Sequence, residues 1–429
     1  MHWIPTPFKI PAFRAYFLAR WTSTIGQLAM VIVIGWQVYD IARETMSVSE
    51  ASFRLGMIGL VQFIPLFVLV PITGYAADHY DRRWVGRMTI LLELGCAAAL
   101  GWYAWEGTTT LTALFVVAAL LGVARAFSGP AFQALAPNLV PREILPSAIA
   151  LSSISWQSGS IIGPALGGYL YAVSPATPYL VSAALFALSI LATFGIPVVP
   201  RPIVDTTVSF WRRTTDGIRY VRTNHLVLGA ISLDLFAVLL GGATAMLPVF
   251  ARDILHTGPE GLGNLRAAPA LGATLTAAWF TFRPMKSNVG VKMLWAVALF
   301  GAATVVFGLS RSMELSLAAL VVLGAADMFS VNIRQSLIQL HTPDDKRGRV
   351  GAVSSLFISA SNELGEAESG LLAALIGPVV AVVAGGIGAV FVVALWAWKF
   401  PELRLAKTFD PPDMGDLPQV IRDQKESVT

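Results

Sequence analysis

The chain has 429 residues, of which 55% are hydrophobic and only 13% are charged, and its mean hydropathy is +0.66. Because soluble proteins carry about a quarter charged residues, this composition excludes an ordinary soluble globular enzyme. The formal net charge of +4 would suit a nucleic-acid-binding protein, but the basic residues follow a membrane pattern instead. The single cysteine, Cys96, lies inside an apolar run and indicates no disulfide.

Apolar stretches of membrane length recur twelve times along the chain. They cover residues 13–39, 55–77, 84–105, 111–140, 146–173, 178–199, 226–250, 261–282, 289–309, 313–340, 351–376 and 379–400. Since about 20 apolar residues cross a bilayer as a helix, the pattern predicts an all-α polytopic membrane protein with twelve transmembrane helices. The first run is too long for a signal-peptide core, so we expect it to be retained.

Lysine and arginine divide unequally between the two sides that this helix count creates. With both ends inside, the internal segments hold 23 of them and the external segments five, namely Arg43, Arg54, Arg252, Arg266 and Arg311. The positive-inside rule therefore predicts that both termini are cytoplasmic. Two further arginines, Arg125 and Arg334, fall inside predicted helices.

The chain also repeats itself. Residues 122–168 and 324–370, at an offset of 202, share thirteen identities in 47 positions, which indicates two duplicated six-helix halves with the same membrane orientation. The predicted parts are an N-terminal bundle at 1–199, a cytoplasmic linker with an amphipathic helix at 200–225, a C-terminal bundle at 226–400 and a cytoplasmic tail at 401–429. An even number of helices per half predicts a pseudo-twofold axis along the membrane normal.

Three motifs carry a family resemblance. The loop after the second helix contains Gly74, Asp78, Asp81, Arg82 and Arg83, which resembles the major facilitator signature G-x-x-x-D-x-x-G-R-[KR] with Asp81 in place of the glycine. The fifth helix resembles the glycine-proline motif of exporters in this superfamily, through Gly159, Gly163, Pro164, Gly167 and Gly168. The stretches 125–131 and 361–370 resemble the enterobactin-exporter-like group of drug and siderophore efflux proteins.

The resemblance implies a major facilitator fold of two pseudo-symmetric six-helix bundles that transports by alternating access. In the loop motif, Asp78 would accept hydrogen bonds from a neighbouring helix end, and Arg82 and Arg83 would pair with carboxylates across the two halves as a latch. The alternative is that the two arginines only set topology. The helix-5 glycines, spaced by four, would allow close approach of a partner helix, either for sealing the cavity or for packing alone.

Charged residues inside membrane helices are costly and point to function. The set comprises Glu93, Arg125, Asp234, Asp327, Arg334, Glu363, Glu366 and Glu368, with Asn362 beside Glu363. By the repeat offset Arg125 corresponds to Asp327, so the two could form a gating or coupling pair, a structural ion pair, or no contact. Arg334, two helical turns from Asp327, could be its neighbour instead.

Glu363 and Glu366 lie three residues apart on one helix face, and two nearby carboxylates in low dielectric suit a proton carrier. The alternative is pairing with Arg125 or with the basic loop. Asp234 and Glu93 are further candidates for proton coupling, or they cap or bridge helices.

No phosphate-binding loop is recognised, and His2, His79, His225, His256 and His341 all fall at termini or loops. We therefore expect no enzyme activity, no cofactor, no metal site and no nucleic-acid partner. The sequence predicts a monomeric, proton-coupled exporter of an amphipathic small molecule, such as a siderophore or drug, surrounded by membrane lipid. An importer or uniporter of the same fold, and a non-transporting receptor or scaffold, are the alternatives.

Overall fold

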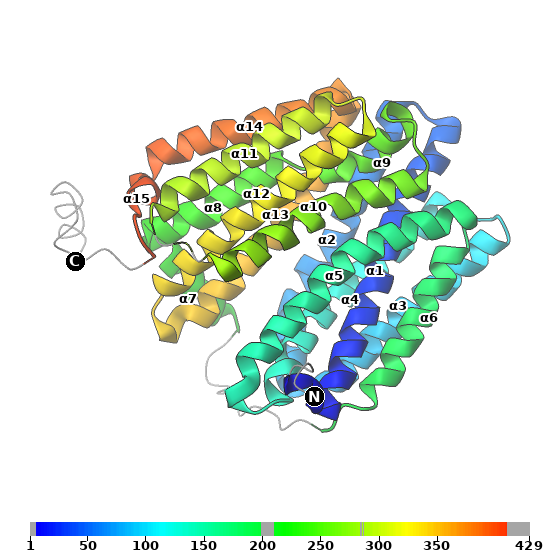
Figure 1. Cartoon of the computed structure of the whole chain (residues 1–429). Helices are drawn as coiled ribbons and strands as arrows, with labels where there is room; N and C mark the ends of the chain where they lie inside the picture. The colour runs from blue at the N-terminus through cyan, green and yellow to red at the C-terminus, as the bar shows by residue number, and fades with distance from the viewer. Residues whose placement is uncertain (1–5, 199–209, 284, 286, 410–429) are drawn as a thin grey trace, which may run out of the picture.

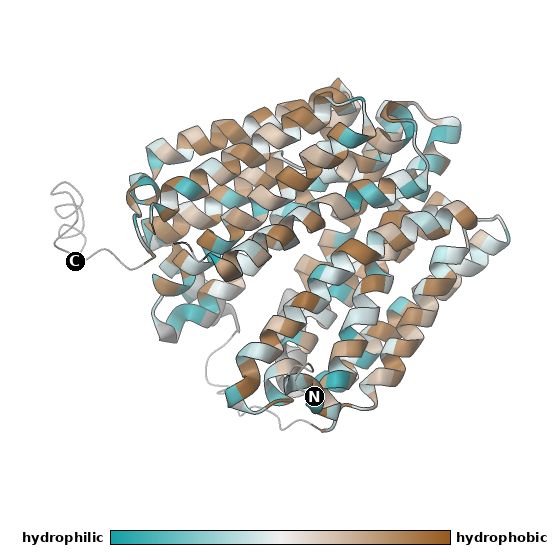
Figure 2. Ribbon diagram, in the orientation of Figure 1, coloured by the Kyte–Doolittle hydropathy of each residue, from teal (hydrophilic) through white to brown (hydrophobic). Residues whose placement is uncertain are grey.

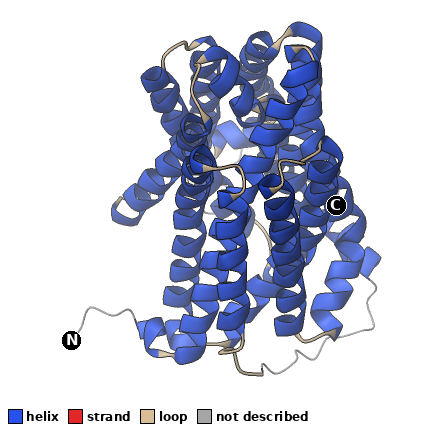
Figure 3. Cartoon of the chain, turned by 90° about the vertical axis from the view of Figure 1, so that its right-hand side faces the viewer, coloured by secondary structure: helices blue, strands red, loops and turns tan. Residues whose placement is uncertain are grey.

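The computed structural model describes residues 6–198, 210–283, 285 and 287–409, which form helices joined by loops, with no strand among them (Figure 3). The long helices of the N-terminal part are α1 (Pro11–Thr45), α2 (Val48–His79), α3 (Arg82–Trp105), α4 (Leu111–Leu135), α5 (Leu145–Val173) and α6 (Thr177–Thr193). After α7 (Phe210–Thr223) come α8 (His225–Leu240), α9 (Leu247–Val249), α10 (Pro259–Phe282), α11 (Val289–Leu309), α12 (Met313–Leu340), α13 (Asp344–Ile376), α14 (Pro378–Lys399) and α15 (Pro401–Leu405).

The predicted apolar stretches coincide with these helices. In the part of the chain that the structure describes, eight helical stretches are long and apolar enough to cross a membrane, and α6 is a shorter apolar helix. The prediction of an all-α polytopic membrane protein is confirmed, and the twelve stretches are consistent with its helix count. Ranges 289–309 and 313–340 match α11 and α12 to the residue.

Helix starts follow local capping rather than hydropathy. The helix α2 begins seven residues before the predicted stretch because Ser47 and Glu50 form a capping box, in which the Ser47 hydroxyl accepts from the Glu50 amide at 3.3 Å. The duplicated helices α4 and α12 begin 202 residues apart with equivalent caps, Thr110 and Ser312, each accepting from the third amide of its helix at 3.2 Å.

The seventh apolar stretch, 226–250, is not one continuous helix. After α8 the chain passes through a short 3-10 turn, Ala243–Met246, then α9, and then η5, a π-helical turn at Phe250–Ile254. The break occurs at Gly241 and Gly242, where a Cβ on Gly242 would lie 2.7 Å from the carbonyl oxygen of Gly365 in α13. The absence of a side chain therefore allows the broken segment to pack directly on α13.

The helices form two groups, α1–α6 and α8–α14, which we call the first and second group (Figure 1). The same packing recurs in each: α2 contacts α4 and α3 contacts α6, as α10 contacts α12 and α11 contacts α14. Between the groups α2 packs on α13, and its counterpart α10 packs on α5. These repeated contacts give the pseudo-twofold relation that the duplication predicts.

We call the end of the bundle where α1 finishes at Thr45 the distal end, and the opposite end, where α1 begins at Pro11, the proximal end. In Figure 1 the two groups meet toward the upper right, near the label α9, and diverge toward the lower left. Hydrophobic residues dominate the helices, whereas hydrophilic ones gather mostly near the helix ends (Figure 2). Large apolar side chains such as Trp102, Phe282 and Trp295 are exposed, as membrane-facing residues are.

The helix α7 lies within the predicted linker and packs against α13 of the second group. Val221 joins a small apolar cluster with Val227, Ile338, Val350 and Val353. The Tyr220 hydroxyl donates to the carbonyl of His341 at 2.7 Å. The part of the linker at 200–209 and the tail beyond Phe409 lie outside the described residues, so the domain boundaries stay predictions.

Candidate functional site

An ion pair joins the two groups near the middle of the bundle. The Arg125 Nη1 of α4 lies 2.7 Å from the Glu363 Oε1 of α13, and the same nitrogen donates to the Gln62 Oε1 of α2 at 3.0 Å. The Glu363 side chain is only 8% exposed, whereas that of Arg125 is 36% exposed. The pair therefore holds a buried carboxylate against a cation that water can reach.

Glu366 lies at the same contact between the groups. A Cβ on Gly59 of α2 would lie 2.8 Å from the Glu363 carbonyl and 3.0 Å from the Glu366 Oε2, so the missing side chain allows α13 to approach α2 at this level. Arg266 of α10 reaches the Glu366 Oε1 at 3.8 Å. Two carboxylates and two arginines, drawn from α4, α10 and α13, thus share one region.

Of the three arrangements expected for Arg125 and Asp327, an ion pair between them is not found among the described residues. Among the described residues Arg125 has Glu363 as its ion-pair partner, and Arg334 has Asp234. The repeat offset relates equivalent positions by symmetry, and equivalent positions need not touch. Pairing of Glu363 with Arg125, the alternative to a free proton carrier, is the arrangement present.

The Asp234–Arg334 pair connects α8 to α12 inside the second group, with side chains 9% and 3% exposed. Asp234 and Asp327 both line a cavity of about 10 Å³, together with Phe300 and Ser330. That space is about the size of one water molecule. Asp327 therefore lies near the Asp234–Arg334 pair, inside the second group.

Glu93 bridges helices inside the first group. Its Oε2 accepts from the Ser23 hydroxyl of α1 at 3.3 Å, and the residue is 1% exposed.

Asn362 is exposed, so it does not share the buried surroundings of Glu363. Glu368 has a buried Oε2 with no hydrogen-bond partner in the described structure.

The loop motif shows local contacts. Asp81 caps α3, where its Oδ1 accepts from the Arg83 amide at 2.9 Å and its Oδ2 pairs with the Arg83 Nη2 at 2.6 Å. Its φ of −65° explains why no glycine is needed at this position of the motif. These bonds from Arg83 hold the pKa of the Asp81 carboxyl below its usual value.

Arg83 also donates to the carbonyl of Ile196 at 3.1 Å, so these partners in the described structure both belong to the first group. The predicted latch across the groups is therefore not made by Arg83 in this structure, because a carboxylate two residues away is already available. Gly74 and Asp78 lie in α2, but their surroundings are outside the described structure. Arg82 stands at the first position of α3.

The helix-5 motif packs mainly on α1. Added Cβ atoms would lie 2.6 Å from Thr24 at Gly159, 2.9 Å from Leu28 at Gly163 and 2.7 Å from the Ala29 carbonyl at Gly167. Gly168 faces the other way, toward α10 of the second group, where its Cβ would lie 3.0 Å from the Gly263 Cα. Pro164 is buried within this helix. Close packing explains the first three glycines, and Gly168 serves the contact between groups.

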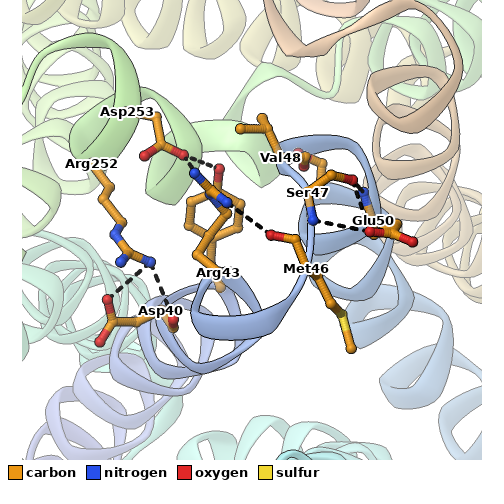
Figure 4. A network of polar contacts seen from close by, with 10 residues as sticks. Asp40, Arg43, Met46, Ser47, Val48, Glu50, Arg252 and Asp253 are labelled. Atoms are coloured by element: carbon orange, nitrogen blue, oxygen red, sulfur yellow. Dashed lines mark hydrogen bonds and ion pairs between the residues drawn. The ribbon is translucent and has the colours of Figure 1, made fainter.

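Sequence reasoning missed a polar network at the distal end. Asp40 and Arg43 of α1 face Arg252 and Asp253 of η5 (Figure 4). The external position of Arg43 and Arg252 was expected, but pairing them with acids required knowing that η5 packs beside α1. The sequence did contain a signal, because two segments at the distal end each carry an acid and a base within four residues. These segments are the end of α1, with Asp40 and Arg43, and η5, with Arg252 and Asp253.

Comparisons with known proteins show the family of this chain. A family model described as "Transmembrane secretion effector" matches residues 4–411. The enterobactin exporter EntS of Citrobacter koseri is 27% identical over 413 residues, which cover 95% of each chain, and that of Escherichia coli O127:H6 is 26% identical over 410 residues, 94% of each.

Among solved structures, a bacterial homologue of the human lysosomal transporter Spinster, in an inward-facing and occupied conformation, aligns with a TM-score of 0.71. Its sequence identity is 13%, over 93% of this chain and 99% of that one, so it supports the fold. The helical architecture, the duplication and the family match lead to one assignment. The chain is a multi-pass membrane transporter that belongs to the transmembrane secretion effector family of the major facilitator superfamily.

Proposed function

We propose that this transporter is a proton-coupled exporter of an amphipathic small molecule of the siderophore or drug class, working by alternating access in a bacterial inner membrane. The similarity to enterobactin exporters over nearly the whole chain supports the substrate class. The observation that carries the coupling mechanism is the Arg125–Glu363 ion pair between the two groups.

The Arg125–Glu363 pair links the protonation of Glu363 to the separation of the two groups. Because Arg125 belongs to the first group and Glu363 to the second, any motion that separates α4 from α13 must break it. Breaking it leaves a buried carboxylate without its cation, which is unfavourable unless the carboxylate takes up a proton. Proton binding at Glu363 thus favours separation of the groups, and proton release favours their closure.

Glu366 extends the same mechanism to a second helix pair. It lies against Gly59 of α2 and within 3.8 Å of Arg266, so it shares the contact that separation would open. In this proposal Glu363 carries the transported proton, and Glu366 exchanges that proton with Glu363. Asp234, Asp327 and Glu93, whose contacts stay inside one group, contribute packing and local charge balance.

The positive-inside rule supports a cytoplasmic proximal end and cytoplasmic termini. Since the groups meet at the distal end, the structure then corresponds to a state open toward the cytoplasm, ready to take up substrate for export. Membrane lipid surrounds the bundle, and a single chain forms the working unit.

The test is substrate-dependent proton movement in proteoliposomes. Glu363→Gln and the Glu363→Gln/Glu366→Gln double variant should reduce export driven by a pH difference by at least about tenfold, because an amide cannot exchange the proton. Glu314→Gln, at an exposed carboxylate in the first turn of α12, serves as the matched control and should export at the wild-type rate.

Export by the double variant with an unchanged dependence on the pH difference would overturn the coupling role of these acids. Proton and substrate movement in the same direction would favour the importer alternative, and substrate movement without protons a uniporter. Absence of any substrate flux across a panel of catecholate siderophores and amphipathic dyes would favour the non-transporting receptor or scaffold.

A further inference from the structure

The distal network joins the groups through two ion pairs that run in opposite senses. The Asp40 Oδ1 of α1 lies 3.0 Å from the Arg252 Nη1, while the Arg43 Nε, one turn further along α1, lies 3.2 Å from the Asp253 Oδ2 (Figure 4). The first group thus contributes an acid and a base, and the second group contributes a base and an acid. Such a crossed arrangement fixes the register of the two helical ends as well as attracting them.

Further bonds anchor each arm. The buried Tyr39 hydroxyl donates to the same Asp253 Oδ2, and Arg252 also donates to the carbonyl of Asp40 at 3.1 Å. Arg43 in turn donates to the carbonyl of Met46 at 2.8 Å, where α1 has ended. Each arginine therefore binds a carboxylate of the other group and also a backbone carbonyl. That carbonyl belongs to α1 for Arg252 and to the C-terminal cap of α1 for Arg43.

The backbone of the second group is shaped for this contact. Arg252 and Asp253 are consecutive residues of the π-helical turn η5, and Phe250 and Ala251 at its start are buried. A π-helical turn inserts one extra residue per turn, and such turns occur often at functional sites. Here the wider turn presents two neighbouring side chains to one face of α1.

We propose that Tyr39, Asp40, Arg43, Arg252 and Asp253 form a distal lock, which holds the distal end closed in this state and must open before the distal end can separate. The lock is distinct from the Arg125–Glu363 pair and requires neither a particular substrate nor a particular coupling ion. It sets the equilibrium between the distally closed and distally open states.

The size of the effect follows from exposure. The four charged side chains are 25–38% exposed, so water screens each pair and its contribution is modest. Two such pairs acting together, with the Tyr39 bond, should favour the closed state by about three- to tenfold, and tenfold corresponds to about 1.4 kcal/mol.

The test measures the distance between spin labels at Thr108 and Glu314, two exposed distal positions in different groups, in full-length protein in lipid nanodiscs with Cys96 replaced by alanine. Arg43→Asp should raise the fraction of the long-distance, distally open population by about three- to tenfold, since it places an acid against Asp253. Adding Asp253→Arg should return the population to within about twofold of wild type. If Arg43→Asp folds poorly, Arg43→Gln is the milder variant, because it removes the positive charge without placing an acid against Asp253.

Arg54→Ala provides the matched control, because Arg54 is an exposed arginine at the same end of the first group and has no ion pair in the described structure. An equal rise in the open population with Arg54→Ala, or a swapped double variant as open as the single one, would overturn the lock. Because the measurement is a distance without substrate, it can succeed even where the proposed proton coupling fails.

Discussion

The distal and proximal ends of this transporter use their charged residues differently. At the distal end, and down to the middle of the bundle, ion pairs cross between groups, as in Asp40–Arg252 and Arg125–Glu363. Toward the proximal end, the pairs Asp81–Arg83, Asp234–Arg334 and Asp216–Arg349 each remain inside one group or its linker helix. In the proposed mechanism, the contacts that must break during transport are thus separated in space from the contacts that keep each group rigid.

The glycines follow the same division. A Cβ on Gly56 would lie 2.5 Å from the Gly370 Cα, and the symmetry-related contact of Gly168 with Gly263 joins α5 to α10. Both contacts are distal and both cross between groups. Close backbone approach at these two points therefore reinforces closure of the distal end, and neither contact would survive its opening.

The largest expected effect concerns a pair within one group. Arg334→Met leaves Asp234 buried without its cation, so it should lower the free energy of unfolding by about 3–5 kcal/mol. Arg43→Ala, at a partly exposed pair between groups, should cost less than about 1 kcal/mol. Denaturant unfolding of the two variants in detergent checks the difference, and replacing Asp234 by leucine as well should recover most of the Arg334 loss. Equal losses for Arg334→Met and Arg43→Ala would remove the distinction between rigid and switching pairs.

An intermediate effect is expected from two glycines of the same helix. Gly370→Ala places a methyl group against the Gly56 backbone. It should change the free-energy difference between the distally closed and open states by about 1–3 kcal/mol in favour of the open state, which the spin-label distances report. Gly351→Ala, near the proximal end of α13 with nothing within 4 Å of its added Cβ, should leave the distances unchanged and slightly stabilise the helix. A similar opening in both variants would show that helix propensity, and not the contact between groups, controls the state.

The smallest effect concerns Asp81 and pH. Because its pKa is lowered in the folded protein, the stabilisation is present above the unfolded value of about 3.9 and is lost as pH falls through the folded pKa. Asp81→Asn keeps an acceptor for the cap but removes the ion pair with Arg83, which should cost less than about 1 kcal/mol at neutral pH. Apparent melting temperatures from pH 7 to pH 3 should converge for the two proteins. A gap that persists unchanged at pH 3 would assign the loss to something other than this charge.

Much of the fold was predictable because membrane helices carry a strong local signal. The ranges of α11 and α12 follow from hydropathy alone, and the equal caps Thr110 and Ser312 follow from the repeat offset. The break after α8 was not predicted, since Gly241 and Gly242 are neutral in hydropathy and interrupt a helix without interrupting an apolar run.

The site was predicted less completely. The charged residues were identified because burial of charge in a membrane is costly, but their partners depend on how the helices rotate and pack. The repeat offset related Arg125 to Asp327, whereas α4 and α13 both pack on α2, and Arg125 pairs there with Glu363. Likewise, the distal lock depends on η5 lying beside α1, 210 residues away for Arg43 and Asp253, which no local pattern reveals.

The most direct test of the proposed coupling measures distances at both ends of the molecule in one variant. Spin labels at Thr108 and Glu314 report the distal end, and labels at the exposed residues Glu143 and Thr223 report the proximal end. Glu363→Gln imitates the protonated acid and removes its ion pair with Arg125. The proposed coupling predicts that the distal distance lengthens while the proximal distance shortens. Distances that stay unchanged at both ends, or that lengthen together, would contradict it.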